Sequence, residues 1–266
     1  RAAVEGDTGR AAKCDWRMTT MRVLIACEFS GTVRNAFLAR GHDAWSCDLL
    51  PSDDGSNRHI TGDARELLHD GWDLLIVAHP PCTRLCNSGV RWLSVPPPGK
   101  TGAQMQAELV EGAALFSAFW NAPIERIAVE NPVMHKHAKA LIEGYAEPAQ
   151  SVQPWQFGHG ETKRTCLWLK NLPALVPTNI VAGREQRVHR MSPGPERWKE
   201  RSRTYAGIAN AMAEQWGGDA EALEVGISTK MNITAEHAGA DEGNLDSGFH
   251  GGVHGRHTRS PRNTGL

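Results

Sequence analysis

The chain has 266 residues, 40% of them hydrophobic, which suits one α/β domain with small additions. Its formal net charge is −1, so the molecule as a whole is no polycation, and any contact with nucleic acid has to come from a local basic patch. No stretch approaches the roughly 20 apolar residues of a membrane span, and six scattered cysteines favour reduced thiols in the cytosol over a disulfide framework.

Short apolar runs alternate along the chain with segments of helical periodicity. The apolar runs predict buried strands at 22–27, 43–48, 72–78, 124–130 and 165–169, and the periodic segments predict helices at 33–40, 64–69, 103–121 and 204–216. This alternation predicts an α/β fold with a Rossmann-like, doubly wound parallel sheet. We expect a catalytic core over 21–169, a very small basic region for target recognition over 170–203, and a helix over 204–219 that returns to the core.

Both ends of the chain lack such patterns. Residues 1–20 mix small and charged side chains, and residues 220–266 are small, polar and rich in His and Arg. Sequences of this kind bury too little apolar surface to offset the entropy lost on ordering. We therefore expect a disordered extension at 1–20 and a disordered tail at 220–266.

Polar or reactive residues follow four of the predicted strands. They are Glu28–Gly31, Asp48, Pro80–Cys82 and Glu130–Pro132. In a doubly wound sheet, ligands bind at the carboxyl ends of the strands. The sequence therefore predicts one functional site formed by these four segments.

The first of these segments is typical of a cofactor site, to which we assign Glu28, Phe29, Ser30, Gly31 and Thr32. Gly31 would let a ligand approach the backbone and the free amides at the start of a helix. Asp48, at the end of the next strand, is placed to accept both ribose hydroxyls of a nucleoside. Asp63 is placed to bind an adenine amino group or, equally, to cap a helix. Because neither GxGxxG nor GxxxxGK[ST] occurs, a neutral or cationic nucleoside is favoured over a dinucleotide or a triphosphate.

Pro80-Pro81-Cys82 and Glu130-Asn131 resemble the DNA cytosine-C5 methyltransferases, which place Pro-Cys after the fourth strand and Glu-Asn after the fifth. The segments 79–92 and 161–173 are similar to small phage-type members. The resemblance covers about residues 21–216. It implies S-adenosylmethionine as the cofactor, with Pro80 beside it, and double-stranded DNA as the partner. It also implies a monomeric, cytoplasmic protein of a bacterium or a phage-infected host, without a membrane or a bound metal.

The chain departs from the family pattern at several positions. Val33 stands where a second glycine is usual, and Pro132 follows Glu-Asn in place of valine. Only Lys163-Arg164 stands near the place of the usual Gln-x-Arg-x-Arg motif. The target sequence, and the choice between DNA and RNA, therefore stay open.

The chemistry of the resembling family gives roles to two residues. Addition of the Cys82 thiolate to C6 of cytosine would place electron density on C5, which can then attack a methylsulfonium. A carboxyl group at Glu130 would hold N3 and offset the charge on the ring. We interpret Cys86 as structural and His79 as a hydrogen-bonding residue of the loop.

Several residues are assigned to the substrate: Arg91, Asn131, Lys163, Arg164, Arg187 and Arg190. The segment 184–203 is rich in arginine and contains Pro193, Gly194 and Pro195, which favour a loop along a phosphate backbone. A base inside a duplex could reach the site only by flipping out of the stack.

Three other functions remain open. An RNA cytosine-C5 methyltransferase would use the same two residues. An amino-methyltransferase is disfavoured, because such enzymes carry Asp/Asn-Pro-Pro-aromatic where this chain has His79-Pro80-Pro81-Cys82. A non-catalytic nucleic-acid-binding relic of the fold is kept open by Val33 and Pro132.

Overall fold

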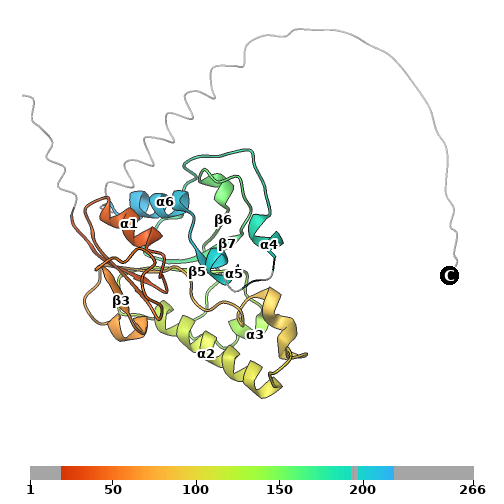
Figure 1. The fold of residues 1–266 in the computed structure, drawn as a ribbon. Coiled ribbons are helices and arrows are strands. Elements are labelled where there is room, and N and C mark those ends of the chain that lie inside the picture. Colours follow the sequence, from red (N-terminus) through yellow and green to blue (C-terminus); the bar gives the residue numbers. More distant parts are fainter. Residues whose placement is uncertain (1–18, 193, 195–196, 219–266) are drawn as a thin grey trace, which may run out of the picture. The chain divides into compact units, whose positions relative to one another are not determined.

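In the part of the chain that the structure describes, seven strands form one sheet in the order β3-β2-β1-β4-β5-β7-β6 (Figure 1). The computed structural model describes residues 19–192, 194 and 197–218. The strands are β1 (Arg22–Ala26), β2 (Asp43–Asp48), β3 (His59–Thr61), β4 (Leu74–Val77), β5 (Arg126–Asn131), β6 (Gln150–Val152) and β7 (Thr165–Lys170). The α-helices are α1 (Thr32–Leu38), α2 (Gly102–Trp120), α3 (Lys136–Lys139), α4 (Arg187–Arg190), α5 (Arg197–Ser202) and α6 (Ala206–Trp216). Short 3₁₀ helices are η1 (Ala64–Leu67), η2 (Asn87–Leu93) and η3 (Pro154–Gln156).

The first five strands of the sheet run parallel, in the order 3-2-1-4-5 of Rossmann-like sheets. The chain builds one half of the sheet with β1, β2 and β3, and then crosses to the other half with β4, which pairs with β1 although the two strands are not consecutive. Crevices at such a switch point are where open α/β sheets bind ligands. The predicted α/β, Rossmann-like, doubly wound class is confirmed.

One part of the sheet differs from the prediction of parallel strands throughout. Strand β7 runs antiparallel to both β5 and β6. The expected strand at 165–169 is confirmed, but its direction is wrong, because an apolar run gives no sign of which way it crosses the sheet. Strands β3 and β6 have three residues each, which is too short to produce a recognisable pattern.

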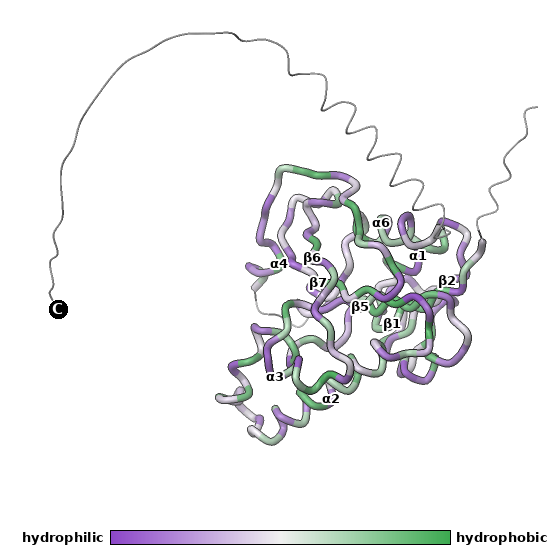
Figure 2. Tube along the Cα trace, turned by 180° about the vertical axis from the view of Figure 1, so that it is seen from behind, coloured by the Kyte–Doolittle hydropathy of each residue, from purple (hydrophilic) through white to green (hydrophobic). Residues whose placement is uncertain are grey.

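The sheet is covered on both faces, so alternate residues of a strand enter different cores. In β1, Val23 and Ile25 pack with helices α1 and α6, whereas Leu24 and Ala26 pack with α2. Figure 1 shows α1 and α6 on one side of the sheet and α2 and α3 on the other. The most apolar stretches of the chain follow the central strands β1 and β5 (Figure 2).

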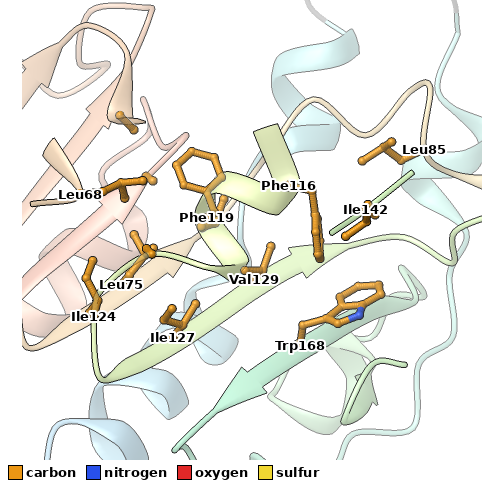
Figure 3. Packing of buried hydrophobic residues seen from close by; sticks show 14 of the residues in the cluster. Leu68, Leu75, Leu85, Phe116, Phe119, Ile124, Ile127, Val129, Ile142 and Trp168 are labelled. Atoms are coloured by element: carbon orange, nitrogen blue, oxygen red, sulfur yellow. The ribbon is translucent and has the colours of Figure 1, made fainter. Parts of the chain in front are cut away.

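Aromatic side chains pack helix α2 against strands β5 and β7 of the sheet (Figure 3). The ring of Phe116 meets the indole of Trp168 on β7 edge-on, with centroids 5.3 Å apart. Phe119, Ile127 and Val129 fill the same core and are fully buried. These contacts hold α2 against β5 and β7.

The predicted tail at 220–266 lies outside the described residues, as does nearly all of the predicted extension at 1–20. Among the helices that the structure describes, none combines the length and the apolar character that crossing a bilayer requires.

Candidate active site

A cavity of about 800 Å³ opens at the carboxyl ends of β1, β2, β4 and β5. This is within the range of roughly 300–1,000 Å³ that small-molecule sites occupy. Its walls include Asp48 at the end of β2, Cys82 after β4 and Glu130 on β5. Three of the four strand-end segments singled out in the sequence therefore meet there through side chains with chemical function.

The reversed direction of β7 adds a further segment to this edge. Cys166, near the start of β7, pairs with Asn131 at the end of β5. The residues that precede β7 therefore lie beside the carboxyl end of β5. Lys163 and Arg164 both line the cavity, together with Glu130.

Cys82 and Cys86 lie one turn apart in the loop after β4. The amides of Leu85 and Cys86 donate to the carbonyl of Cys82 at 2.9 and 3.0 Å. Cys82 is partly exposed, whereas Cys86 is buried, and both line the cavity. The interaction between the two thiols raises the pKa of Cys82 and lowers that of Cys86. Burial and the nearby Glu130 carboxylate raise the pKa of Cys82 further.

This loop is held against the segment that follows β5. The amide of Asn87 donates to the carbonyl of Val133, and the amide of His135 donates to that of Leu85, both at 3.0 Å. Gly89 packs so closely that a Cβ atom there would lie 1.8 Å from the carbonyl oxygen of Thr83. The position of the two thiols is thus fixed by main-chain contacts.

Glu130 presents its carboxyl group to the cavity from β5. Burial raises its pKa to about 7, although Lys163 and a hydrogen bond with Thr165 act in the opposite direction. Burial also lowers the pKa of Lys163, while Glu130 and Cys82 favour its charged form. Near neutral pH the Glu130 carboxyl is therefore divided between its acid and its anion, and either form is available.

His79 lies in the cavity wall just before Pro80 and Pro81. Its Nε2 is 3.0 Å from the hydroxyl of Thr204, and burial holds the pKa of the imidazole well below its usual range. The neutral ring is therefore engaged in a contact with the start of α6. This agrees with the interpretation of His79 as a hydrogen-bonding residue of the loop.

The other end of the cavity carries the predicted cofactor acids. Asp48 accepts a hydrogen bond from the amide of Leu50 at 2.9 Å, and burial raises its pKa. Asp63 accepts from the amide of Arg65 at 2.9 Å, so it caps η1, and the Arg65 guanidinium lowers its pKa. Because Asp63 also lines the cavity, both of its predicted roles are compatible with its position.

The predicted cofactor turn reaches the cavity mainly through Phe29. Glu28 is fully buried, and its carboxylate accepts the amides of Val33 and Arg34 at 2.7 and 3.1 Å. Burial raises the pKa of Glu28 to about 7. Glu28 thus caps helix α1 from inside the protein and does not line the cavity.

The backbone at Gly31 is also constrained by packing within the protein. Its φ is +69°, and a Cβ atom there would lie 2.1 Å from the guanidinium of Arg34. Ser30 and Thr32 share a hydrogen bond, with their hydroxyls 3.1 Å apart. None of the three lines the cavity, whereas the neighbouring Pro80, after β4, does.

The predicted substrate residues divide into two groups. Lys163 and Arg164 line the cavity. Arg91 lies over the ring of Trp92, 4.1 Å from its centroid, and Arg187 pairs with Glu161 at 2.9 Å, so both are engaged elsewhere. Neither lines the cavity, and nor does the exposed Arg190.

Asn131 is fully buried and takes no part in the cavity wall. Its side-chain amide donates to the carbonyl of Pro132 at 2.9 Å, and its Oδ1 has no partner among the described residues. This geometry agrees with a role in fixing the turn after β5.

Some residues of the cavity wall were not singled out in the sequence. Val188 and His189 come from α4, and Trp198 and Arg201 come from α5. The ring of Trp198 lies 5.8 Å from that of Phe29. The basic composition of 184–203 was the one sign in the sequence that this segment belongs to the site. Helices as short as α4 and α5 show no periodicity in the sequence by which they could be predicted. Cys27, which also lines the cavity, has a φ of 56°, a strained conformation that is concentrated at functional sites.

No protein-family model matches the chain, and no curated protein matches it. A solved structure of an E. coli protein described as a DNA modification methyltransferase encoded within a prophage is similar, with 15% identity and a TM-score of 0.38, over 61% of this chain and 52% of the other. The S. pombe Dnmt2 methyltransferase shows 16% identity and a TM-score of 0.33, over 64% of this chain and 53% of the other. This chain therefore spans about half the length of each.

Proposed function

We propose that this protein transfers a methyl group from S-adenosylmethionine to C5 of cytosine in DNA, through a covalent bond between Cys82 and C6 of a flipped-out base. One observation carries the proposal. A partly exposed thiol and a carboxyl group whose pKa is about 7 face one cavity, which continues to the acid at the end of β2. A nucleophile, an acid and a nucleoside-binding carboxylate are the groups this reaction needs.

Cys82 and Glu130 have complementary tasks in this reaction. The sulfur of Cys82 adds to C6 of the ring, which ends its aromaticity and moves electron density to C5. The protonated carboxyl of Glu130 donates to N3 and offsets the negative charge that the addition creates. The raised pKa of Glu130 supports this role, because a carboxyl with its usual pKa would hold little of its acid form at neutral pH.

The acidic end of the cavity fits S-adenosylmethionine. Asp48 would accept the ribose hydroxyls, and Asp63 would accept a hydrogen bond from the adenine amino group. Phe29 and the exposed Leu49 supply apolar surface beside them. When bound, S-adenosylmethionine supplies an electrophilic methyl group for C5.

The opposite rim supports DNA as the substrate. Arg164 and Arg201 are exposed at the cavity wall, and neither is paired with a described acidic residue. Guanidinium groups there would contact the phosphates on either side of the target. Lys163, deeper in the wall, is placed to reach the flipped base itself. A duplex base can enter the cavity only after it leaves the stack.

A trapping experiment tests the proposal. DNA that contains 5-fluorocytosine should form a denaturant-stable complex with the protein when S-adenosylmethionine is present, because the fluorine cannot be removed as a proton is. Cys82→Ala should form none. Cys166→Ala, which alters another buried thiol on β7, should be trapped like the wild type.

Three results would contradict the proposal in different ways. Trapping that survives in Cys82→Ala and is lost in Cys86→Ala would move the nucleophile to Cys86. Trapping of fluorinated RNA in preference to DNA would change the substrate. No trapping of any nucleic acid by a folded protein that binds S-adenosylmethionine would reject cytosine-C5 chemistry.

A further inference from the structure

Helix α5 belongs to the segment in which nucleic-acid contacts were expected, yet it docks against the turn after β1. The ring of Trp198 lies 5.8 Å from the ring of Phe29, tilted by 53°. The guanidinium of Arg203, just after the helix, lies 5.8 Å from the same ring and pairs with Asp53. Asp53 in turn donates its backbone amide to the carbonyl of Phe29 at 2.9 Å. Both ends of α5 are therefore tied to the turn that carries Phe29.

This packing leaves much of the Trp198 indole uncovered. Trp198 is 48% exposed, more than any other tryptophan that the structure describes, and it lines the cavity. The buried Trp72, Trp168 and Trp216 each donate their indole N–H to a main-chain carbonyl. Within the described residues, no group accepts a hydrogen bond from the indole of Trp198, and the ammonium of Lys199 lies 5.8 Å from its ring centroid. A large ring that is held at a cavity and stays uncovered is suited to contact a ligand.

The groups beside Trp198 fit a nucleoside. Leu49, 76% exposed, and Phe29 line the same cavity. Asp48, at the end of β2, directly precedes Leu49 and adds a carboxylate to the wall. Small-molecule sites combine apolar and aromatic walls with a few placed polar groups. A nucleoside offers a flat base to the apolar walls and ribose hydroxyls to the carboxylate.

Helical spacing places a second side chain of α5 beside the indole. Arg201 follows Trp198 by three positions, so the two lie on the same side of the helix. Both line the cavity, and Arg201 is exposed. One short helix thus presents an aromatic ring and a guanidinium to the same cavity. Because it is Trp198 that meets Phe29, the ring is the group that serves the cofactor end.

We propose that Trp198 is a cofactor-binding residue, whose indole contacts the adenosine part of S-adenosylmethionine. This inference rests on the proposed function, since it concerns the cofactor of that reaction. It changes the interpretation of 184–203, which was expected to contact nucleic acid alone. Trp198 binds the cofactor, while Arg201 of the same helix remains available to phosphates. The small recognition region therefore completes the cofactor site.

The first test is titration calorimetry on the full-length protein without DNA. S-adenosylhomocysteine is the probe, because it carries the same adenosine and has no methyl group to transfer. Trp198→Leu keeps an apolar side chain and removes the ring, so the dissociation constant should rise by roughly fivefold to a hundredfold, the usual effect of losing one base–aromatic contact. Trp198→Phe keeps a ring and should stay within about threefold of the wild type. Trp155→Leu, which alters a tryptophan outside the cavity wall, is the control and should bind normally.

The second test detects the contact itself through tryptophan fluorescence. Saturating S-adenosylhomocysteine should quench the emission of the wild type and of Trp155→Leu. Trp198→Phe, at its own saturating concentration, should lack this change. Adenosine alone should reproduce the Trp198-dependent quenching, and methionine alone should not. A merely structural role of Trp198 would not produce a signal that follows the adenosine part of the ligand.

The outcomes separate this inference from the proposed function. Unchanged affinity of a folded Trp198→Leu protein for S-adenosylhomocysteine would overturn the role of Trp198. So would an equal loss in Trp155→Leu, or a loss of DNA affinity in Trp198→Leu while cofactor affinity is kept, which would make the indole a nucleic-acid contact. A protein that binds S-adenosylhomocysteine through Trp198 but is never trapped on fluorinated nucleic acid would reject the cytosine chemistry alone. A wild type that does not bind S-adenosylhomocysteine would reject both.

Discussion

The imidazole Nε2 of His79 lies 3.0 Å from the hydroxyl of Thr204, although the two residues are 125 positions apart. This contact joins the loop that carries Cys82 to the residue that precedes helix α6. Burial keeps the imidazole neutral near physiological pH. The loop is therefore braced from the C-terminal side by a contact that does not change with pH in that range.

Replacing Thr204 by valine keeps the shape of the side chain and removes the hydroxyl. We expect Thr204→Val to lower the free energy of unfolding by about 1–3 kcal/mol, because a buried ring nitrogen loses its partner. Urea denaturation measures the change. Thr178→Val, at an exposed threonine, is the control and should change little. Equal stability of the two variants would show that the brace contributes nothing.

Glu130→Gln should slow single-turnover methylation by roughly 10²–10⁴, the usual contribution of a general acid. Affinity for S-adenosylmethionine should not change, because Asp48 and Asp63 lie at the other end of the cavity. Glu111→Gln, which alters another cavity-lining carboxyl group, serves as the control. A rate within threefold of the wild type would exclude the role assigned to Glu130.

The rate should also depend on pH through Glu130. Its pKa is raised to about 7, so the acid form dominates below that pH and declines tenfold per unit above it. The wild-type rate should therefore lose its Glu130 contribution as the pH rises from 7 to 9. In Glu130→Gln this alkaline decline should be missing. An identical pH profile in both proteins would argue against titration of Glu130.

Asp48→Ala should weaken S-adenosylmethionine binding by about 1–3 kcal/mol, the range for losing hydrogen bonds to a charged group. Titration calorimetry on the free protein gives this value without any need for turnover. Asp70→Ala, at an exposed aspartate outside the cavity wall, should bind as the wild type does. Unchanged affinity of a folded Asp48→Ala protein would remove Asp48 from the site.

Gly89→Ala should disrupt the loop after β4 that carries Cys82 and Cys86, because the new Cβ atom would lie 1.8 Å from the Thr83 carbonyl oxygen. We expect trapping on fluorinated DNA to fall by at least tenfold while circular dichroism remains close to that of the wild type. Gly102→Ala places a methyl group in open space at the start of α2, and should be trapped normally. Normal trapping of Gly89→Ala would mean that the loop has room to shift.

We also propose that residues beyond the last helix are dispensable for catalysis. Every residue of the cavity wall precedes α6. Truncation after Asp219 should leave methyl transfer within about twofold of the full chain. A tenfold loss in a truncated protein that is still folded would assign substrate contacts to 220–266.

The sequence predicted the central part of the fold because apolar runs such as 22–27 and 72–78 have to be buried on both faces. It also predicted that Asp48, Cys82 and Glu130 would meet, since the ends of parallel strands share one edge. An apolar run does not show in which direction its strand crosses the sheet. The antiparallel direction of β7, which brings Lys163 to the cavity, could therefore be seen only in the structure.

The sequence also does not show which of the predicted site residues face the cavity and which pack inside the protein. Gly31 was expected to admit a ligand, yet it makes room for the guanidinium of Arg34. Glu28 was expected at the cofactor, yet its carboxylate caps α1. Both expectations were based on the position of these residues after the first strand. In the structure both residues face the protein interior, and this orientation depends on how α1 packs, which the sequence position does not show.

The cavity wall is drawn from separate stretches of the chain, from Cys27 after β1 to Ser202 at the end of α5. No fragment that lacks one of these stretches has a complete wall, so the site exists only in the cooperatively folded domain. The amount of covalent complex formed with fluorinated DNA would therefore measure the amount of folded protein. During urea titration, the captured fraction should fall together with the far-ultraviolet signal, and the reaction would serve as an assay of folding yield.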